Sequence, residues 1–183
     1  LKLCITLKTT HNMATILPVK GVNPTIKESC WLAPNATVVG DVEMGEDCTI
    51  WFNAVIRGDV NAIRIGNKVN IQDGAVIHCT YEKTQTIIGH NVSIGHNAIL
   101  HGCEVEEEVL IGMGAIVMDG AVIEKNAIIG AGAVVTQNTR VPSGTIWVGN
   151  PAKYLKDVSP TAGEVFMRTA NNYLTYAGWF GKE

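Results

Sequence analysis

A six-residue period of hydrophobic positions runs through most of this chain of 183 residues. From Val105 to Trp147 a large apolar residue recurs at every sixth position, and a smaller residue, often alanine, follows four positions later. Extended toward the N-terminus, the same frame reaches Ile26 with a few insertions and gives 20 repeats. The large positions are Ile26, Leu32, Val38, Met44, Ile50, Ile56, Ile65, Ile71, Ile77, Ile88, Ile94, Leu100, Val105, Ile111, Val117, Ile123, Ile129, Val135, Val141 and Trp147.

Hexapeptide repeats of this kind are typical of a parallel β-helix, in which three repeats make one triangular turn and residues about 18 positions apart stack. We therefore predict an all-β solenoid over residues 13–158. The period stops after residues 149–151, and Ser159 followed by Pro160 favours a helix start, with serine as the N-cap and proline at the first helical position. We predict a C-terminal α-helix over residues 159–178 that packs on the solenoid or on a neighbouring subunit.

Two insertions interrupt the period as projecting loops. Three extra residues separate Ile56 from Ile65, and five separate Ile77 from Ile88, where residues 80–86 are polar and charged. With the five-residue insertion left out, His78 and His101 are 18 positions apart, which is one turn. Each follows a large position of the same face, so both imidazoles point outward from neighbouring strands, about 4.7–4.9 Å apart.

A third histidine, His96, falls on the preceding face and lies directly above Asp73. Within one chain it sits across a corner from His78 and His101. A copy rotated about a parallel three-fold axis would bring His96 to face that pair, so the frame predicts a homotrimer with three metal sites, each split between two chains. Three neutral imidazoles with an open fourth position are typical of catalytic zinc, which lowers the pKa of bound water to about 7.

Other interpretations of these histidines remain open. A lone histidine on a β-helix is usually a surface or interface residue. His90 occupies the same slot as His96 one repeat earlier and has no partner in register, so we interpret it as a surface residue. Cys79 and Cys103 lie near the histidines and are alternative soft ligands, although three imidazoles already give a better geometry.

Polar residues around the histidines suggest further roles. Gln72 points outward on the face of His96, where its amide can hold a hydroxide or a small substrate through hydrogen bonds. Asn70 precedes it, and Asp73 can accept the second ring N–H of His96. Arg57 and Asp59 can pair with each other, across a subunit boundary, in a structural role.

Composition narrows the function further. The net charge of −3 and the lack of a Lys/Arg cluster argue against nucleic acid, and the sequence has no apolar run of the roughly 20 residues that cross a bilayer. Five cysteines without a CxxC pair favour a reducing compartment, hence the cytoplasm. Cys30 and Cys48 should stack in successive turns as two small core residues, with a disulfide as the alternative.

The N-terminus calls for a separate interpretation. Residues 1–12 precede Met13 and contain no apolar core long enough for a cleaved signal. We expect these residues to be an extension that is non-native or disordered, so that His11 carries no function.

Four segments together resemble the gamma-class carbonic anhydrase family, and the resemblance covers roughly residues 15–180. The segments are residues 54–59 (AVIRGD), 70–74 (NIQDG), 76–78 (VIH) and 95–102 (GHNAILHG). The resemblance implies a left-handed β-helix that forms trimers. It also implies that His78, His96 and His101 bind zinc, or alternatively iron or cobalt.

The same resemblance assigns roles to the residues around the metal. It implies that Gln72 and Asn70 line the bound water and bicarbonate. Arg57, Asp59 and Asp73 match positions at the subunit interface or behind the ligands. Tyr173 matches a helix tyrosine that reaches toward the site.

The sequence departs from efficient members of that family in two places. They carry a glutamate where this chain has Val60, and an acidic loop after the first ligand where this chain has the short residues 79–87 with Glu82 as the one carboxylate. We predict an enzyme for the reversible hydration of CO2 to bicarbonate in which slow proton transfer gives low turnover. The alternatives are an acyl-CoA thioesterase or acyltransferase on the same scaffold, and a structural trimer held together by metal.

Overall fold

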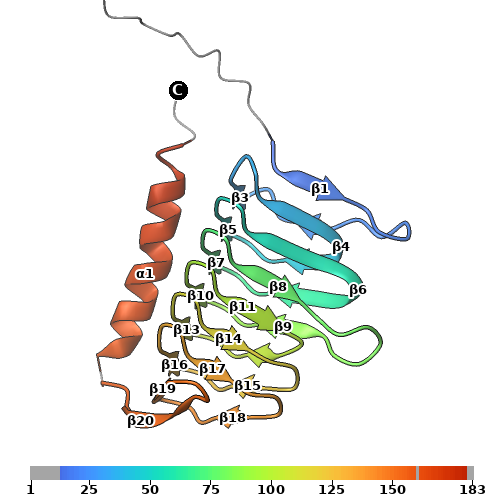
Figure 1. Cartoon of the computed structure of the whole chain (residues 1–183). Coiled ribbons are helices and arrows are strands. Elements are labelled where there is room, and N and C mark those ends of the chain that lie inside the picture. Colours follow the sequence, from blue (N-terminus) through green and yellow to red (C-terminus); the bar gives the residue numbers. More distant parts are fainter. Residues whose placement is uncertain (1–12, 160, 181–183) are drawn as a thin grey trace, which may run out of the picture.

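The computed structural model describes residues 13–159 and 161–180. It confirms the predicted all-β solenoid, a left-handed β-helix of about seven turns with one C-terminal helix (Figure 1). The expected N-terminal extension, residues 1–12, and the expected first helical residue, Pro160, lie outside the described residues. Within those residues, no helix is long and apolar enough to cross a membrane.

Three sides of parallel strands build the prism. Strands β4 (Thr37–Met44) and β6 (Val55–Ile65) turn a corner and belong to two sides, which joins these sides into one 12-stranded sheet. The first side also holds β1 (Thr15–Leu17), β8 (Val76–His78), β11 (Ile99–His101), β14 (Ile116–Val117) and β17 (Val134–Val135). The second also holds β2 (Thr25–Ile26), β9 (Thr86–Ile88), β12 (Glu104–Val105), β15 (Val122–Ile123) and β18 (Arg140–Val141).

The third side is a separate eight-stranded sheet with β3 at one edge and β20 at the other. Its strands are β3 (Trp31–Leu32), β5 (Thr49–Ile50), β7 (Asn70–Ile71), β10 (Ser93–Ile94), β13 (Leu110–Ile111), β16 (Ile128–Ile129), β19 (Thr145–Val148) and β20 (Lys153–Asp157). The last strand, β20, pairs antiparallel with β19 and closes the C-terminal end of the prism. The hexapeptide period does not predict β20, because the period ends before this strand begins.

The large position of each repeat points into the prism and stacks on the same position of the next turn. Ile56 pairs with Ile77, and Ile77 pairs with Leu100, so the five-residue insertion does not disturb the register. All three side chains are completely buried. The chain turns its corners through left-handed residues such as Asn97, with a φ of 57°. At the corner below, a Cβ on Gly74 would collide with the Asn97 side chain, so this close approach requires glycine.

Helix α1 (Ala162–Ala177) runs back along the third side and packs on β5 and β10 (Figure 1). It buries Phe166, Ala170 and Ala177 against the prism, and its C-cap is Gly178, the last residue of the predicted range. The predicted N-cap was wrong: Thr161 occupies that position. The Ser159 hydroxyl instead accepts a hydrogen bond from Thr161 N at 3.4 Å in the turn before the helix.

The core should be more sensitive to truncation than the surface of the same strand. In β9, Ile88 is 2% exposed and its neighbour Ile87 is 43% exposed. We expect Ile88→Ala to lower the free energy of unfolding by about 2–5 kcal/mol, because it removes buried methyl groups and leaves a cavity. Ile87→Ala, the matched control, should cost less than about 1 kcal/mol. Urea unfolding followed by circular dichroism measures both, and equal losses would contradict the inward-outward assignment.

Candidate functional site

Two imidazoles stack on the first side of the prism, as the frame predicts. His101 lies opposite His78 in the register of β11 and β8. The ring centroids are 5.1 Å apart, and His78 Nδ1 lies 3.1 Å from His101 Nε2. The side chains are 15% and 33% exposed, so the pair is shielded from solvent but reachable.

Each of the three histidines is held by one aspartate. Asp59 Oδ1 lies 3.0 Å from His78 Nε2, and Asp119 Oδ2 lies 2.9 Å from His101 Nδ1. On the neighbouring corner, Asp73 Oδ2 lies 2.9 Å from His96 Nδ1, which confirms the predicted stacking of these two residues. A carboxylate on one ring nitrogen fixes the tautomer and leaves the other nitrogen as a lone-pair donor. The two stacked rings turn these remaining nitrogens toward each other.

The separation of the two nitrogens fits a shared metal. Two imidazole nitrogens on one tetrahedral zinc, each about 2.0–2.1 Å from the ion, lie about 3.3–3.4 Å apart. His78 Nδ1 and His101 Nε2, at 3.1 Å, are close to that value. Among the described residues of one chain, no three His, Cys, Asp or Glu side chains gather closely enough to hold a metal. His96 belongs to the corner between the third and first sides, as the frame predicts.

The carboxylates behind the stacked pair are stabilised in their charged form. Burial opposes the ionisation of Asp59, but hydrogen bonds from His78 and from Arg57 outweigh it and lower the pKa of the carboxyl. Arg57 Nη1 lies 2.6 Å from Asp59 Oδ2, so this pair forms within one chain. Burial likewise opposes the ionisation of Asp119, but hydrogen bonds from Thr80, Thr84 and His101 lower its pKa.

The 80–86 loop supports the site from the side. The hydroxyls of Thr80 and Thr84 donate to Asp119 Oδ1 at 2.7 and 2.8 Å. Thr86 is completely buried, and its hydroxyl donates to the His78 carbonyl at 2.6 Å and accepts from Gly102 N at 2.9 Å. The loop is therefore bonded to the strands of both stacked histidines.

The sequence analysis missed Asp119. This residue lies 18 positions after His101 on the next turn, and that spacing is the signal that could have identified it. The six-residue frame predicts only which equivalent positions stack on one another. Asp119 is one position past the residue that stacks on His101, so a search limited to equivalent positions overlooks it.

A buried polar column lies on the third side, which α1 covers. Asn70 is 1% exposed and Gln72 is 6% exposed. Gln72 Nε2 donates to Asn70 Oδ1 at 2.9 Å, and Asn70 Nδ2 donates to the hydroxyl of buried Ser93 at 2.8 Å. The hydrogen bond to Asn70 engages the Gln72 amide nitrogen and fixes the orientation of the amide. The carbonyl oxygen of Gln72 is then the group that can accept a further hydrogen bond. Ser93 is a second residue that the sequence analysis did not identify.

Tyr173 lies half-buried on α1, with its ring edge-on to Trp51 at a centroid distance of 5.3 Å. Burial raises the pKa of the Tyr173 hydroxyl, and the negative charge of Asp73 raises it further. The tyrosine therefore lies on the side of the prism that carries Asp73 and His96. The structure does not test its predicted catalytic role.

The remaining candidate residues occupy surface or core positions. His90 is exposed, and its Nδ1 accepts a hydrogen bond from Asn67 N at 2.9 Å, in agreement with the predicted surface position. Cys79 and Cys103 are 1% and 2% exposed, and burial raises the pKa of both thiols. Val60 packs half-buried against the core, and Glu82 is exposed on the loop.

Comparison with known proteins gives two matches to family models. The model described as "Bacterial transferase hexapeptide (six repeats)" matches residues 23–58 and 102–137. A second, described as "Hexapeptide repeat of succinyl-transferase", matches residues 85–118. Both matches agree with the repeat on which the fold is built.

The chain is also similar to proteins named as carbonic anhydrases. It is 44% identical over 168 residues to gamma carbonic anhydrase 1, mitochondrial, of Arabidopsis thaliana, covering 89% of this chain and 61% of that protein. It therefore spans about three-fifths of the length of this plant relative. It is 45% identical over 144 residues to the carbonic anhydrase of Geobacillus kaustophilus, covering 79% of both chains.

A crystal structure with the same fold covers nearly all of the chain. It is a hexapeptide transferase family protein from Anaplasma phagocytophilum, 37% identical, with a TM-score of 0.86 over 91% of this chain and 98% of that one.

The buried hydroxyl of Thr86 should contribute to the stability of the site. We expect Thr86→Val to lower the free energy of unfolding by about 1–3 kcal/mol, because valine keeps the shape but leaves the His78 and Gly102 backbone groups with one hydrogen bond fewer in a dry environment. Thr25→Val, at an exposed strand position, is the control and should cost less than about 0.5 kcal/mol. Urea midpoints give the stability, and NMR of the histidine rings should show shifts at His78 and His101 for Thr86→Val alone.

Proposed function

Because the chain belongs to the gamma-class carbonic anhydrase family, we propose that it catalyses the metal-dependent, reversible hydration of CO2 to bicarbonate. One observation carries the proposal. His78 and His101 stack in register and face each other with ring nitrogens 3.1 Å apart, each ring held from behind by an aspartate. A structural pair of surface histidines would not need two separate carboxylates to select the nitrogens that face each other.

The proposed enzyme is a homotrimer with its sites between subunits. His96 offers a third imidazole whose Nδ1 is held by Asp73, which leaves Nε2 as the donor. Its side chain is 42% exposed on a corner, so it is available to a neighbour. Exposed apolar side chains accompany it: Ile99 is 37% exposed and Met113 is 59% exposed. Association would cover these side chains and bring the partner subunit's His96 to the stacked pair.

Three imidazoles suit zinc, and they also suit ferrous iron or cobalt. A zinc ion held by His78, His101 and the partner subunit's His96 would supply a nucleophile at neutral pH by acidifying a water molecule. The three aspartates orient the imidazoles and select which ring nitrogen is left to bind a metal. The metal, the trimer and the hydration activity together form the proposal.

Gln72 and Asn70 are the proposed binding residues for the oxygen atoms of water and bicarbonate. The Gln72 amide is held by Asn70, and Asn70 is held by Ser93, so the Gln72 carbonyl oxygen has a fixed direction. A fixed acceptor beside the site orients a proton-bearing oxygen without the entropy cost of ordering a free side chain. Tyr173, on the helix that covers this side of the prism, is proposed to line the same site.

Proton release is the proposed weak step of this enzyme. Val60 and the single loop carboxylate of Glu82 replace the acidic groups expected from efficient members of the family. Glu82 is exposed and lies on the same loop that supports Asp119. Without a group of suitable pKa in reach of the site, the proton produced in each cycle must leave through buffer.

Acyl transfer is the second candidate function, since both matching family models and the Anaplasma protein carry the name of transferases. Binding of coenzyme A, measured by calorimetry, would favour it. A trimer in which metal serves only to hold subunits together is a third candidate, and dissociation by chelators without any activity would favour that one. We propose the cytoplasm as the location, although the plant relative is named as mitochondrial.

Removal of the corner histidine should abolish both metal binding and activity. We expect His96→Ala to reduce metal content to below about a tenth of one ion per subunit and CO2 hydration by more than about 100-fold. The reason is that removal of a metal ligand lowers metal affinity and activity more than removal of a residue that only supports a ligand. His90→Ala, one repeat earlier in the same slot, is the matched control and should change neither. Elemental analysis and stopped-flow hydration assays measure the two quantities. Full metal content in His96→Ala would contradict the assignment of His96 as a metal ligand.

Mixed trimers test whether each site is shared. Co-assembly of His96→Ala and His101→Ala protomers in equal amounts should restore metal and activity to about a quarter of the unmodified level, because each mixed trimer contains one interface with all three ligands. Each variant alone should remain inactive. If the two variants assemble and no activity or metal returns, the ligands are not divided between subunits.

Turnover should depend on buffer. At constant pH and ionic strength, we expect kcat of the metal-loaded enzyme to rise several-fold between about 2 and 50 mM of a non-coordinating buffer with a pKa near 7, while kcat/KM stays constant. The reason is that buffer carries away the proton in the absence of an internal acceptor. Stopped-flow kinetics gives both constants, with metal-free protein as the background, and a kcat independent of buffer would contradict the weak proton step.

A further inference from the structure

Two cysteines stack in the first turns of the prism, away from the histidine site. Cys30 directly precedes β3 and Cys48 directly precedes β5, and these strands pair in parallel with Trp31 opposite Thr49. Trp31 N donates to the Cys48 carbonyl at 2.9 Å. The two cysteines therefore occupy neighbouring rungs of one inward column. The usual strand spacing of about 4.8 Å falls within the Cα separations of about 4.4–6.8 Å that a disulfide bridges.

The two thiols differ in access. Cys48 is completely buried, whereas Cys30 is half-buried. Cys30 Sγ lies 3.0 Å from the Gly45 carbonyl, and Cys48 Sγ lies 3.1 Å from the Gly66 carbonyl. Cys30 is thus the more accessible of two stacked thiols.

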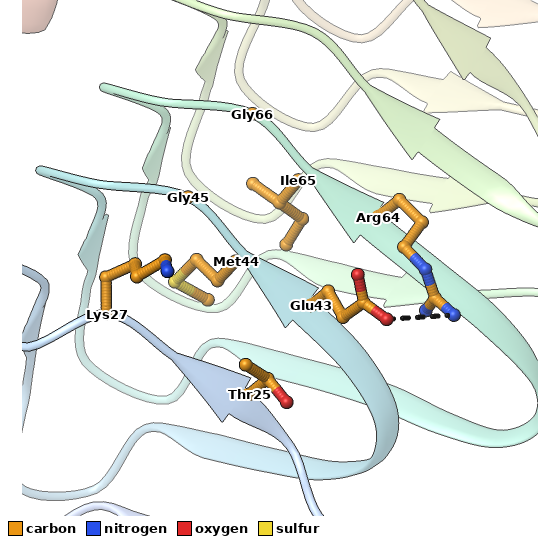
Figure 2. Close-up of a pocket in the computed structure, with 8 residues that line it drawn as sticks. All are labelled: Thr25, Lys27, Glu43, Met44, Gly45, Arg64, Ile65 and Gly66. Atoms are coloured by element: carbon orange, nitrogen blue, oxygen red, sulfur yellow. Dashed lines mark ion pairs between the residues drawn. The ribbon is translucent and has the colours of Figure 1, made fainter.

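The residues drawn in Figure 2 line a surface pocket of about 410 Å³. Gly45 and Gly66, whose carbonyls accept from the two thiols, both line it, together with Lys27. Cys30 N donates to the Lys27 carbonyl at 3.0 Å, so the backbone of Cys30 is attached to the same wall. The pocket is many times the volume of a small polar oxidant such as hydrogen peroxide, given that one water occupies about 30 Å³.

The surroundings favour reaction at Cys30 over the other described thiols. The neighbouring Cys48 side chain lowers the pKa of Cys30 to about 7 against the opposing effect of burial, whereas burial raises the pKa of Cys103 to about 12. The contact with Cys30 raises the pKa of Cys48, and burial adds to the rise. Because the thiolate is the reactive form, Cys30 is the nucleophile of the pair and Cys48 remains a thiol until it is needed.

We propose that Cys30 is a peroxide-reactive thiol and that Cys48 resolves its oxidised form into an intramolecular disulfide. The Cys30 thiolate attacks one oxygen of hydrogen peroxide, so that an S–O bond forms, the O–O bond breaks, and the departing hydroxide takes a proton to become water. Cys48 sulfur then attacks the sulfenic sulfur, the S–S bond forms, and the departing OH leaves with the Cys48 proton as a second water. One peroxide is reduced to two waters, and two thiols are oxidised.

The position of the pair allows the bond to close. Stacked Cβ atoms must approach by about 1 Å to reach the usual separation of about 3.8 Å in a disulfide. β3 is the edge strand of its sheet and has a neighbouring strand on one side only, so it can shift without breaking a second ladder. The bond would join the first turn to the second at an end of the solenoid, where repeat proteins lose structure most easily.

Peptide mapping of the full chain tests the proposal. After treatment with equimolar hydrogen peroxide at pH 7 and alkylation, mass spectrometry should show a Cys30–Cys48 disulfide that dithiothreitol reverses. Without peroxide, Cys30 should react with iodoacetamide at least about 100-fold faster than Cys103. The oxidised protein should melt about 5–10 °C higher than the reduced protein, because the bond closes a loop of about one turn.

Alanine variants separate the two roles, and they should fold because alanine fills the same inward slot at Ala36 and Ala54. Cys48→Ala should stop at a sulfenic acid on Cys30 that dimedone traps, and Cys30→Ala should leave Cys48 unreacted. Cys103→Ala is the matched control and should form the disulfide normally. Alkylation of Cys30 no faster than Cys103, or peroxide treatment that yields no Cys30–Cys48 bond in the unmodified protein, would overturn the proposal.

Discussion

The structure depends on the backbone register between successive turns. Each turn donates to the carbonyls of the next at nearly constant distances, as in the bond from Val76 N to Ala98 O at 2.9 Å. This ladder fixes which side chains stand above one another, because strands pair residue by residue and each side chain alternates between core and surface. A shift of one residue would turn His78 and His101 into the core and expose Ile77 and Leu100.

The register survives an insertion because the inserted residues are bonded to the strands on either side. The 80–86 loop leaves the prism after β8 and returns at β9, and buried Thr86 ties its end to the His78 carbonyl and to Gly102 N. Thr80 and Thr84 reach Asp119 on the following turn. The loop therefore does more than interrupt the prism next to the stacked histidines. It also supplies the hydroxyls that hold the aspartate behind His101.

Stacking of like side chains on successive turns gives two different chemistries at two places in one prism. On the first side, outward imidazoles in register supply two of the three ligands of a proposed metal site. In the first turns, inward thiols in register form a proposed redox pair, and the difference between Cys30 and Cys48 is the access of the outer turn to solvent. In both places the distance between neighbouring strands brings two like side chains within bonding reach of one ion or of each other.

The repeat in the sequence determined the prism, the stacking of His78 on His101 and the position of His96 above Asp73, because a fixed period converts position in the chain into position in space. The Ser-Pro signal after the repeat also located the C-terminal helix, although the sequence analysis missed the strand β20 and placed the N-cap at Ser159 instead of Thr161. Tertiary structure alone decided what holds the rings. Asp119, Thr80 and Thr84 come from a different turn and an irregular loop, and the burial of Gln72, Asn70 and Ser93 depends on how the helix covers the third side. A period states which equivalent positions align, but contacts between unlike positions depend on side-chain direction and loop path, which only the folded chain specifies.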